Sequence, residues 1–250
     1  MKLGIMQPYF FPYLGYFQLI NHVDRWVVFD EVQYNKKSWM NRNRVVHPDI
    51  KEDYQYISVP ICKHAKGTLI REAMINNQIG WREALKGKLT VYKHLGAKNY
   101  GVGLDLVSNV IDRDVNSFLD LSTLSIKAVC KYLDINIHSL ENSSDIHFDR
   151  SSVDGPGDWA LMISKAKNAT QYINPYGGRT LFDEGKYSRE GIELNYLRTC
   201  FSEYKQGRDR AFVRGLSVID LIMFLDKEEI SNLLREDFFL VHPKDVHDKS

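Results

Sequence analysis

The sequence has few cysteines and no surplus of either charge. Its three cysteines, Cys62, Cys130 and Cys200, are widely spaced and odd in number, which argues against a disulfide framework and a CxxC metal knuckle. We expect core or near-core thiols of a reducing compartment. The 33 basic side chains nearly cancel the 32 acidic ones, so no overall field would attract a nucleic acid or a membrane surface.

Long apolar runs are missing as well. No window approaches the roughly 18 apolar residues of a membrane span. The apolar run that follows Lys2 ends at Gln7 and Pro8, too early for a secretory signal, and we predict a cytoplasmic protein that uses no membrane. A chain of 250 residues can bury a sizeable core. We expect one domain over residues 1–250, with residues 141–158 as a candidate flexible loop because Ser, Asp, Gly and Pro crowd there.

The familiar signatures of phosphate, metal and acyl-enzyme chemistry do not occur. There is no Gly-rich phosphate loop of either common type, and no GxSxG motif surrounds a nucleophilic serine. The eight histidines never stand at metal-ligand spacing from one another or from a cysteine, so we expect no metal site. A site must be sought in other clusters.

The pattern of apolar residues predicts an α/β fold. Residues 2–8 form a short apolar run closed by a proline, residues 16–24 have apolar positions near helical spacing, and residues 25–34 are rich in β-formers. Strand, helix and strand within about thirty residues indicate a right-handed unit with parallel strands. Further strands are expected over 54–61, 135–140, 170–175 and 191–197, and helices over 81–95, 115–133, 159–169, 216–225 and 227–236. We predict a three-layer sandwich with a parallel sheet and a helical C-terminus.

The loop after the first strand is the most unusual segment. Two prolines and a glycine fix it at the carboxyl end of that strand, where parallel sheets bind ligands. One interpretation is a hydrophobic plug at the sheet edge. The other is an aromatic cleft for a nucleobase or sugar ring, with an amide and hydroxyl groups as polar handles. The candidate site residues of this loop are Gln7, Tyr9, Phe11, Tyr13 and Tyr16.

A polar cluster follows the second strand. It is either an exposed loop or a phosphate site, since arginine forks match phosphate oxygens and lysine adds a point charge. The alternation of Asn and Arg around a lone tryptophan favours the second interpretation. The candidates are Asp30, Glu31, Gln33, Lys36, Trp39, Asn41, Arg42 and Arg44.

Two later segments also attract attention. Asn174, Gly177 and Gly178 mark a tight turn after a strand, which is either a plain turn or a further part of the ligand edge. Ser217 can cap the helix that carries Asp220. Asp220 stands in an apolar helix, and a buried carboxylate needs a partner.

These segments resemble the WbqC-like family. The resemblance is carried by QPYFFPYLGYFQLI at residues 7–20, FDEVQYNKKSWMNRNRV at 29–45, YINPYGG at 172–178, IELNYL at 192–197 and LSVIDLIMF at 216–224. Membership implies amino-sugar modification in bacterial surface polysaccharide synthesis, with a glycine or other aminoacyl transferase proposed for some members.

The first loop is also similar to nucleotidyltransferase-like enzymes and pantothenate synthetase. Phe11, Pro12, Gly15 and the helix that follows are reproduced, which implies a nucleotidyltransferase-like N-terminal half. The loop is one residue short, and Tyr16 stands where those enzymes keep a histidine that stabilises the triphosphate. That departure puts adenylyl transfer from ATP in doubt.

The preferred hypothesis is a transferase that forms an amide on a nucleotide-linked 4-amino-4,6-dideoxy sugar of the dTDP or UDP type. An acyl or aminoacyl donor is required, and aminoacyl-tRNA is the one nucleic acid envisaged. Asp30 or Glu31 would take the proton, Tyr13 and Tyr16 would orient the sugar or stabilise the oxyanion, and Lys36, Arg42 and Arg44 would hold phosphates. The alternatives are a ligase that makes an acyl-adenylate from ATP and a non-catalytic partner that binds a nucleotide sugar.

Overall fold

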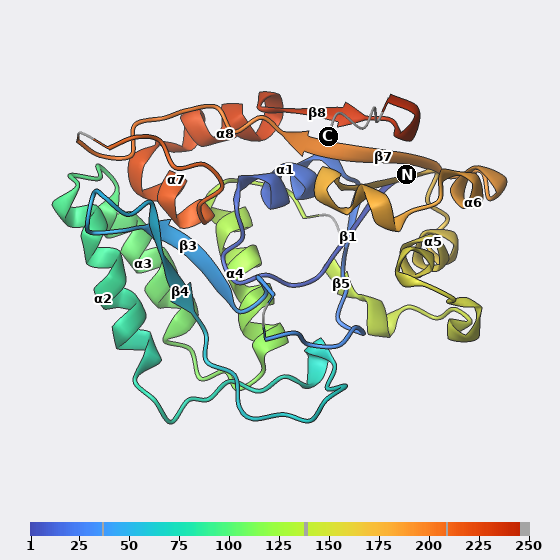
Figure 1. Cartoon of the computed structure of the whole chain (residues 1–250), viewed down its shortest axis with the longest axis horizontal. Helices are drawn as coiled ribbons and strands as arrows, with labels where there is room; N and C mark the ends of the chain where they lie inside the picture. The colour runs from blue at the N-terminus through green and yellow to red at the C-terminus, as the bar shows by residue number, and fades with distance from the viewer. Residues whose placement is uncertain (37, 138–139, 209, 246–250) are drawn as a thin grey trace.

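A mostly parallel sheet of six strands forms the centre of the protein, in a computed structural model that describes residues 1–36, 38–137, 140–208 and 210–245 (Figure 1). The strands lie in the order β5-β2-β1-β6-β7-β8, and only β8 runs antiparallel to its neighbour. Their bounds are β1 (Lys2–Met6), β2 (Arg25–Val28), β5 (Leu140–Asn142), β6 (Gln171–Pro175), β7 (Glu193–Thr199) and β8 (Phe238–Val241).

The first two strands are joined as the sequence predicts. β1 and β2 pair in parallel, with Leu3 opposite Arg25 and Met6 opposite Val28, and helix α1 (Leu14–His22) connects them. The apolar run closed by Pro8 therefore forms the buried central strand of the sheet. The predicted parallel strand–helix–strand unit is confirmed.

Helices cover both faces of this sheet. Side chains of β2 point alternately to the two faces. Trp26 and Val28 join the core under α1, whereas Val27 joins the core on the opposite face. Helix α8 (Lys227–Glu236) packs beside α1, and α5 (Pro156–Ala166) and α6 (Glu184–Arg189) cover the other face. The result is the layered α/β arrangement expected from the sequence.

A second, smaller sheet stands apart from the first. The antiparallel strands β3 (Arg42–Val46) and β4 (Tyr54–Ser58) form a hairpin. It packs against helices α2 (Trp81–His94) and α7 (Val218–Phe224). Helices α3 (Tyr100–Ile111) and α4 (Phe118–Tyr132) extend the same core, which is continuous with the core under α1. Figure 1 shows the hairpin, α2 and α3 on one side of the molecule and α5 and α6 on the other.

Several expectations about individual elements need correction. Residues 42–46, interpreted as part of a polar loop, form β3, and the strand expected at 54–61 pairs with it in the smaller sheet. The C-terminus is not wholly helical, because β8 follows α8 and adds the antiparallel edge strand. Helices α3 and α6 were not predicted. The structure shows a mixed α/β protein, and this arrangement alone does not establish a nucleotidyltransferase-like half.

The segment at 141–158 has more regular structure than a loop. It contains the end of β5, two 3-10 turns and the start of α5. Of the strand expected at 135–140, only Leu140 falls within β5, and residues 138 and 139 lie outside the described residues. The short 3-10 helices of the chain span Ile70–Glu72, Ser143–Asp145, Arg150–Ser152, Tyr176–Leu181 and Pro243–Asp245. Among the described residues, no helix has both the length and the apolar character needed to cross a membrane.

Candidate functional site

Two joined chambers lie over the carboxyl ends of β1, β6 and β7. Strands β1 and β6 are neighbours in the sheet. From β1 the chain continues to β2, on the side of β1 away from β6, and from β6 it continues to β7, on the side of β6 away from β1. Ligands of open α/β sheets bind where the strand order diverges in this way. The larger chamber has a volume of about 700 Å³ and the smaller one about 560 Å³. Tyr13, Pro175 and Gly177 line both, so the two spaces meet along these residues.

The larger space, which we call the aromatic chamber, has mostly apolar walls. Phe29, Trp159 and Phe182 line it, together with Tyr9 of the first loop. The residues at the amino end of α5 form one wall, and Asp158 braces that wall by accepting hydrogen bonds from the backbone N–H groups of residues 154 and 155. Such walls suit an aromatic base or a deoxy sugar ring.

Polar groups at the strand ends face the aromatic chamber. Gln7 follows β1, and Asn174 lies near the end of β6. The amide of Asn174 is held at both ends, because it accepts a hydrogen bond from the Tyr172 hydroxyl at 2.9 Å and donates to the Pro175 carbonyl at 2.8 Å. A Cβ atom on Gly178 would lie 2.4 Å from the Asn174 amide nitrogen, so any larger residue there would have to displace this amide.

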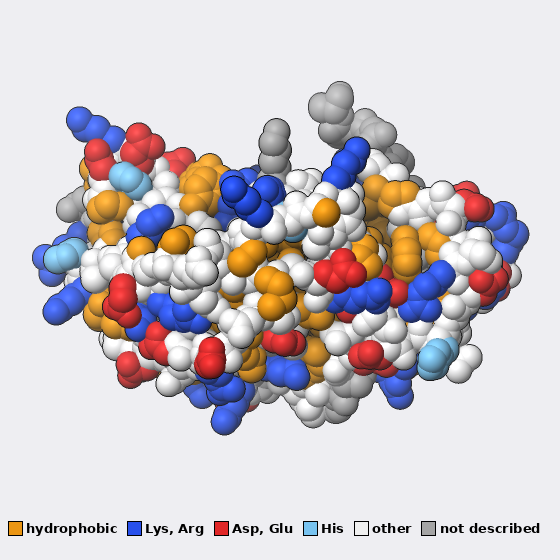
Figure 2. Space-filling model, turned by 90° about the horizontal axis from the view of Figure 1, so that it is seen from below, with side chains coloured by type: hydrophobic (Ala, Val, Ile, Leu, Met, Phe, Trp, Pro, Cys, Tyr) orange, Lys and Arg blue, Asp and Glu red, His pale blue; other side chains and the backbone are white. Residues whose placement is uncertain are grey.

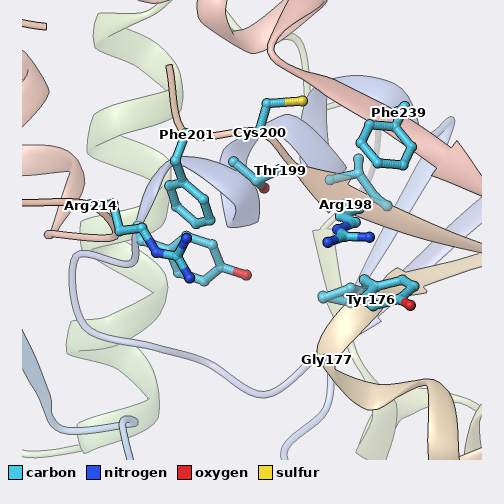
Figure 3. Close-up of a pocket in the computed structure, with 11 residues that line it drawn as sticks. Tyr176, Gly177, Arg198, Thr199, Cys200, Phe201, Arg214 and Phe239 are labelled. Carbon is cyan, nitrogen blue, oxygen red and sulfur yellow. The ribbon is translucent and has the colours of Figure 1, made fainter. Parts of the chain in front are cut away.

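The smaller space, which we call the arginine chamber, is drawn in Figure 3. Arg198 near the end of β7 stacks on Tyr176 at 4.9 Å and on Phe239 at 5.7 Å. Arg214, from the loop before α7, lies over Phe201 at 5.9 Å. The residues that line this chamber include no aspartate or glutamate, and neither arginine has an acidic partner in the described part of the chain.

Tyr13 stands between the two chambers with its hydroxyl group available. Its ring stacks on Phe201 at 6.0 Å, and within the described residues the hydroxyl makes no hydrogen bond. Burial, with a smaller contribution from Tyr9, raises the pKa of Tyr13 to about 12. The hydroxyl therefore keeps its proton at neutral pH and can donate a hydrogen bond to a ligand oxygen.

The first loop divides between the site and the core. Gln7, Tyr9 and Tyr13 line chambers as the cleft interpretation expects. Phe11 and Tyr16 are fully buried, and the Tyr16 hydroxyl donates to the backbone carbonyl of Gln7 at 2.9 Å. The expectation that the Tyr16 hydroxyl faces the cleft is wrong, because the ring packs edge-on against Trp26 in the core. The plug interpretation thus holds for part of the loop.

The two acidic candidates after β2 are anchored away from the chambers. Asp30 is 1% exposed and accepts hydrogen bonds from both side chain and backbone of Ser144 and from the Ser143 hydroxyl, at 2.8 to 3.0 Å. Glu31 accepts from Arg150 at 2.7 Å. These bonds fasten the segment that leads to the α5 wall of the aromatic chamber. Neither carboxylate lines a chamber, so their predicted role as the base is not supported by position.

The polar cluster around Trp39 forms the outer face of the hairpin. Arg42 lies over Tyr56 at 4.9 Å, Arg44 lies over Tyr54 at 4.8 Å, and both lie within 5.6 Å of the Trp39 ring. None of the cluster's candidates lines either chamber, so the structure does not place them at a phosphate site. The other members are Gln33 and Lys36, which are exposed, and Asn41, whose amide donates to the Val59 carbonyl.

The candidate turn after β6 does reach the site. Residues that the sequence analysis did not single out lie beside it. Asn174, Gly177 and Gly178 line the aromatic chamber, and Gly177 lines both chambers. Arg198, Arg214 and Trp159 were missed. Only Arg198 carried a signal, since it directly follows the strand predicted at 191–197.

The cysteines differ from the expectation in one case. Cys130 is buried and Cys62 is half-buried, but Cys200 is exposed and lines the arginine chamber.

Asp220 has the partners that its burial requires. Its carboxylate accepts hydrogen bonds from the hydroxyls of Tyr92 at 2.8 Å and Tyr204 at 2.6 Å and from the Gln206 amide at 2.8 Å. Ser217 caps α7 as predicted by accepting from the Ile219 backbone N–H. This network joins α2, α7 and the loop before α7, which carries Arg214.

Comparison with known proteins relates nearly the whole chain to one family. The model of the WbqC-like protein family matches residues 7–232. An uncharacterized protein of Mycobacterium tuberculosis is 27% identical over 232 residues, which cover 91% of this chain and 95% of that protein. No solved structure matches the chain.

Proposed function

The chain belongs to the WbqC-like protein family, and from this premise we propose that it is a transferase that forms an amide on a nucleotide-linked amino sugar. The single observation that supports this proposal is the pair of joined chambers at the divergence of the strand order. An apolar aromatic space adjoins a polar, cationic one at Tyr13 and Gly177, which line both. A nucleotide sugar has the same division, with ring systems next to a charged linkage. The 4-amino-4,6-dideoxy class is preferred because such a sugar presents an apolar methyl group beside its amine.

The chemistry needs an acceptor amine, an acyl donor and a few positioned groups. The nitrogen lone pair attacks the acyl carbon, a C–N bond forms, and the bond to the leaving group breaks. The proton lost by nitrogen passes to a base, and the acyl oxygen bears negative charge in the transition state. The protonated Tyr13 hydroxyl is the chain's candidate donor to that oxygen. Asp154 is the one carboxylate among the described lining residues of both chambers and replaces Asp30 and Glu31 as the candidate base.

A steric block at the junction tests this proposal. A Cβ atom on Gly177 would meet no atom within 4 Å, so Gly177→Val should fold normally while its side chain narrows the passage. We expect its affinity for a dTDP- or UDP-linked 4-amino-4,6-dideoxy sugar to fall at least about tenfold. Gly101→Val is the matched control, because Gly101 is equally open but lies on α3. Wild-type affinity in Gly177→Val would show that the ligand does not span the chambers.

Product analysis identifies the donor. Mass spectrometry should detect an amide when the sugar nucleotide is incubated with an aminoacyl-tRNA or an acyl thioester. A product formed only with a free acid and ATP, together with released pyrophosphate, would instead identify the acyl-adenylate-forming ligase.

A non-catalytic role is the second candidate, and one observation favours it. The two carboxylates first expected to act as bases, Asp30 and Glu31, are both engaged in anchoring bonds. Binding of the sugar nucleotide without an amide product from any of these donors would support this alternative over the transferase.

A further inference from the structure

The arginine chamber holds two cations that no carboxylate of the described residues neutralises. Arg198 and Arg214 are supplied by separate segments, and Figure 3 shows them on opposite sides of the cavity with their guanidinium groups toward it. Other cations of the chain do have acidic partners; Lys186 bonds Asp158 at 2.6 Å and Lys86 bonds Asp112 at 2.8 Å. Two unneutralised arginines that face one cavity indicate a site for an anion.

Both arginines are exposed, and each guanidinium group lies over an aromatic ring. Arg198 stacks on Tyr176 and Phe239, and Arg214 stacks on Phe201. A guanidinium group that stacks on a ring through its face keeps its N–H groups in the plane, where they can still bind a ligand. A carboxylate partner would occupy those N–H groups. The rings therefore position the arginines without satisfying their hydrogen-bonding capacity.

We infer that the arginine chamber is a diphosphate site, in which Arg198 and Arg214 bind the two phosphoryl groups of the substrate's nucleotide linkage. This inference rests on the proposed function for the identity of the substrate. Two guanidinium forks match two adjacent phosphoryl groups in charge and in bidentate geometry. The Tyr13 hydroxyl lies at the boundary and offers a neutral donor. The diphosphate would then direct the attached ring toward the aromatic chamber.

Calorimetric titration with inorganic pyrophosphate tests the anion site without any sugar. The wild-type protein should bind pyrophosphate, and Arg198→Ala and Arg214→Ala should each weaken binding about tenfold or more, the effect of losing a charge-assisted bond. The double variant should show no measurable binding. Arg198→Lys should recover only part of the affinity, since it restores the charge but not the fork. Equal affinity in all these variants would overturn the inference.

Two control variants separate this site from general charge effects. Arg189→Ala removes an exposed arginine from α6 and should leave pyrophosphate affinity unchanged. Lys36→Ala removes an exposed lysine that the sequence suggested as a phosphate ligand, and it should also keep wild-type affinity. Loss of binding in Lys36→Ala together with normal binding in Arg198→Ala would move the phosphate site to the segment after β2. Melting temperatures of all variants identify any that fail to fold.

The source of the diphosphate is settled by competition. Nucleotide sugars, coenzyme A and ATP all carry linked phosphates, and we expect dTDP or UDP to displace pyrophosphate at lower concentration than coenzyme A or ATP. Stronger displacement by coenzyme A or ATP would assign the chamber to the acyl donor and contradict the inference. The result does not depend on product formation. Pyrophosphate binding that is lost in Arg198→Ala would stand even if no amide were ever detected.

Discussion

Tyr13 and Tyr16 are three residues apart, yet their hydroxyl groups meet opposite environments. Tyr13 precedes the first turn of α1 and faces the junction of the two chambers. Tyr16 lies one turn further on, where the helix turns its side chain into the core and the Gln7 carbonyl takes its hydrogen bond. A helical turn that begins at Leu14 is enough to separate a candidate site residue from a packing residue. The chemistry of the two side chains is the same, and only their position distinguishes them.

Removing each hydroxyl in turn should therefore give opposite results. Tyr16→Phe leaves the partly buried Gln7 carbonyl without this donor, and we expect the free energy of unfolding to fall by about 1–2 kcal/mol with activity retained. Tyr13→Phe should unfold like the wild type but lose about 10²-fold in turnover, as for an oxyanion donor. Denaturant unfolding and product formation measure the pair. A fully active Tyr13→Phe would remove Tyr13 from the mechanism, and an inactive but stable Tyr16→Phe would restore the role first expected for Tyr16.

Asp220 gives the stability of the protein a pH dependence of defined sign. Burial raises the pKa of Asp220 from 3.8 to about 6, although hydrogen bonds from Tyr204, Tyr92 and Gln206 oppose the shift. The folded protein thus keeps a proton that the unfolded chain has released between about pH 4 and 6. The contribution of this group to the free energy of unfolding therefore falls as the pH rises through that window.

Replacing Asp220 with Asn should abolish this pH-dependent term. We expect the stability of Asp220→Asn relative to wild type to rise between pH 4 and 6, by on the order of 2–3 kcal/mol, and to level off above. Urea unfolding of both proteins across this range measures the difference, in which other titrating groups cancel. Parallel stability profiles would mean that Asp220 titrates normally.

Single elements show where sequence patterns suffice and where they fail. The first strand–helix–strand unit is visible because its apolar runs, Pro8 and the β-formers of β2 all act locally. Strand β3 was hidden because its outward positions, Arg42 and Arg44, are polar. Their apolar cover comes from Trp39 and from two tyrosines of β4, which stack on them only after the hairpin has formed. Patterns along one segment do not report cross-strand packing.

The candidate site also contains residues that could be predicted from the sequence and residues that could not. Gln7, Tyr9 and Asn174 were predictable because the ends of parallel strands share one edge of the sheet. Arg198 and Arg214 are sixteen positions apart on segments that meet only because β7 lies beside β6 and the loop before α7 returns over Tyr13. That convergence depends on the strand order, which no local pattern specifies.

A substitution at Asp30 tests whether this residue anchors its segment or acts as the base. Asp30→Asn cannot accept all the hydrogen bonds from Ser143 and Ser144, and the segment that leads to the α5 wall should loosen. We expect a loss of about 1–3 kcal/mol in unfolding free energy and a raised KM, with kcat nearly unchanged. Steady-state kinetics and denaturant unfolding test this. A kcat that collapses in a protein of normal stability would identify Asp30 as the base instead.

At the scale of the whole molecule, charges of both signs are interspersed, and one large core joins the sheet to the hairpin and its helices. Figure 2 shows basic and acidic side chains interspersed over one face, in agreement with a formal net charge of +1. Any attraction for a charged substrate must come from a site such as the arginine chamber. The larger core runs from the sheet through α1 and the hairpin to α2, α3, α4 and α7. The chambers border both regions, because Arg198 and Tyr176 belong to the sheet side, whereas Arg214 belongs to the loop before α7.

This shared core predicts that the protein unfolds in a single transition that the substrate shifts as a whole. Calorimetry should show one peak, since one apolar core of described residues runs from the α1 face of the sheet to the hairpin and its helices. A nucleotide sugar at about 100 times its Kd should add about 2.7 kcal/mol to the free energy of unfolding. Gly177→Val at the same ligand concentration should gain about 1.4 kcal/mol or less, because a tenfold weaker affinity leaves the ligand at only about ten times the variant's Kd. Two peaks, of which the ligand moves only one, would show that the two regions fold separately and that the ligand contacts only one of them.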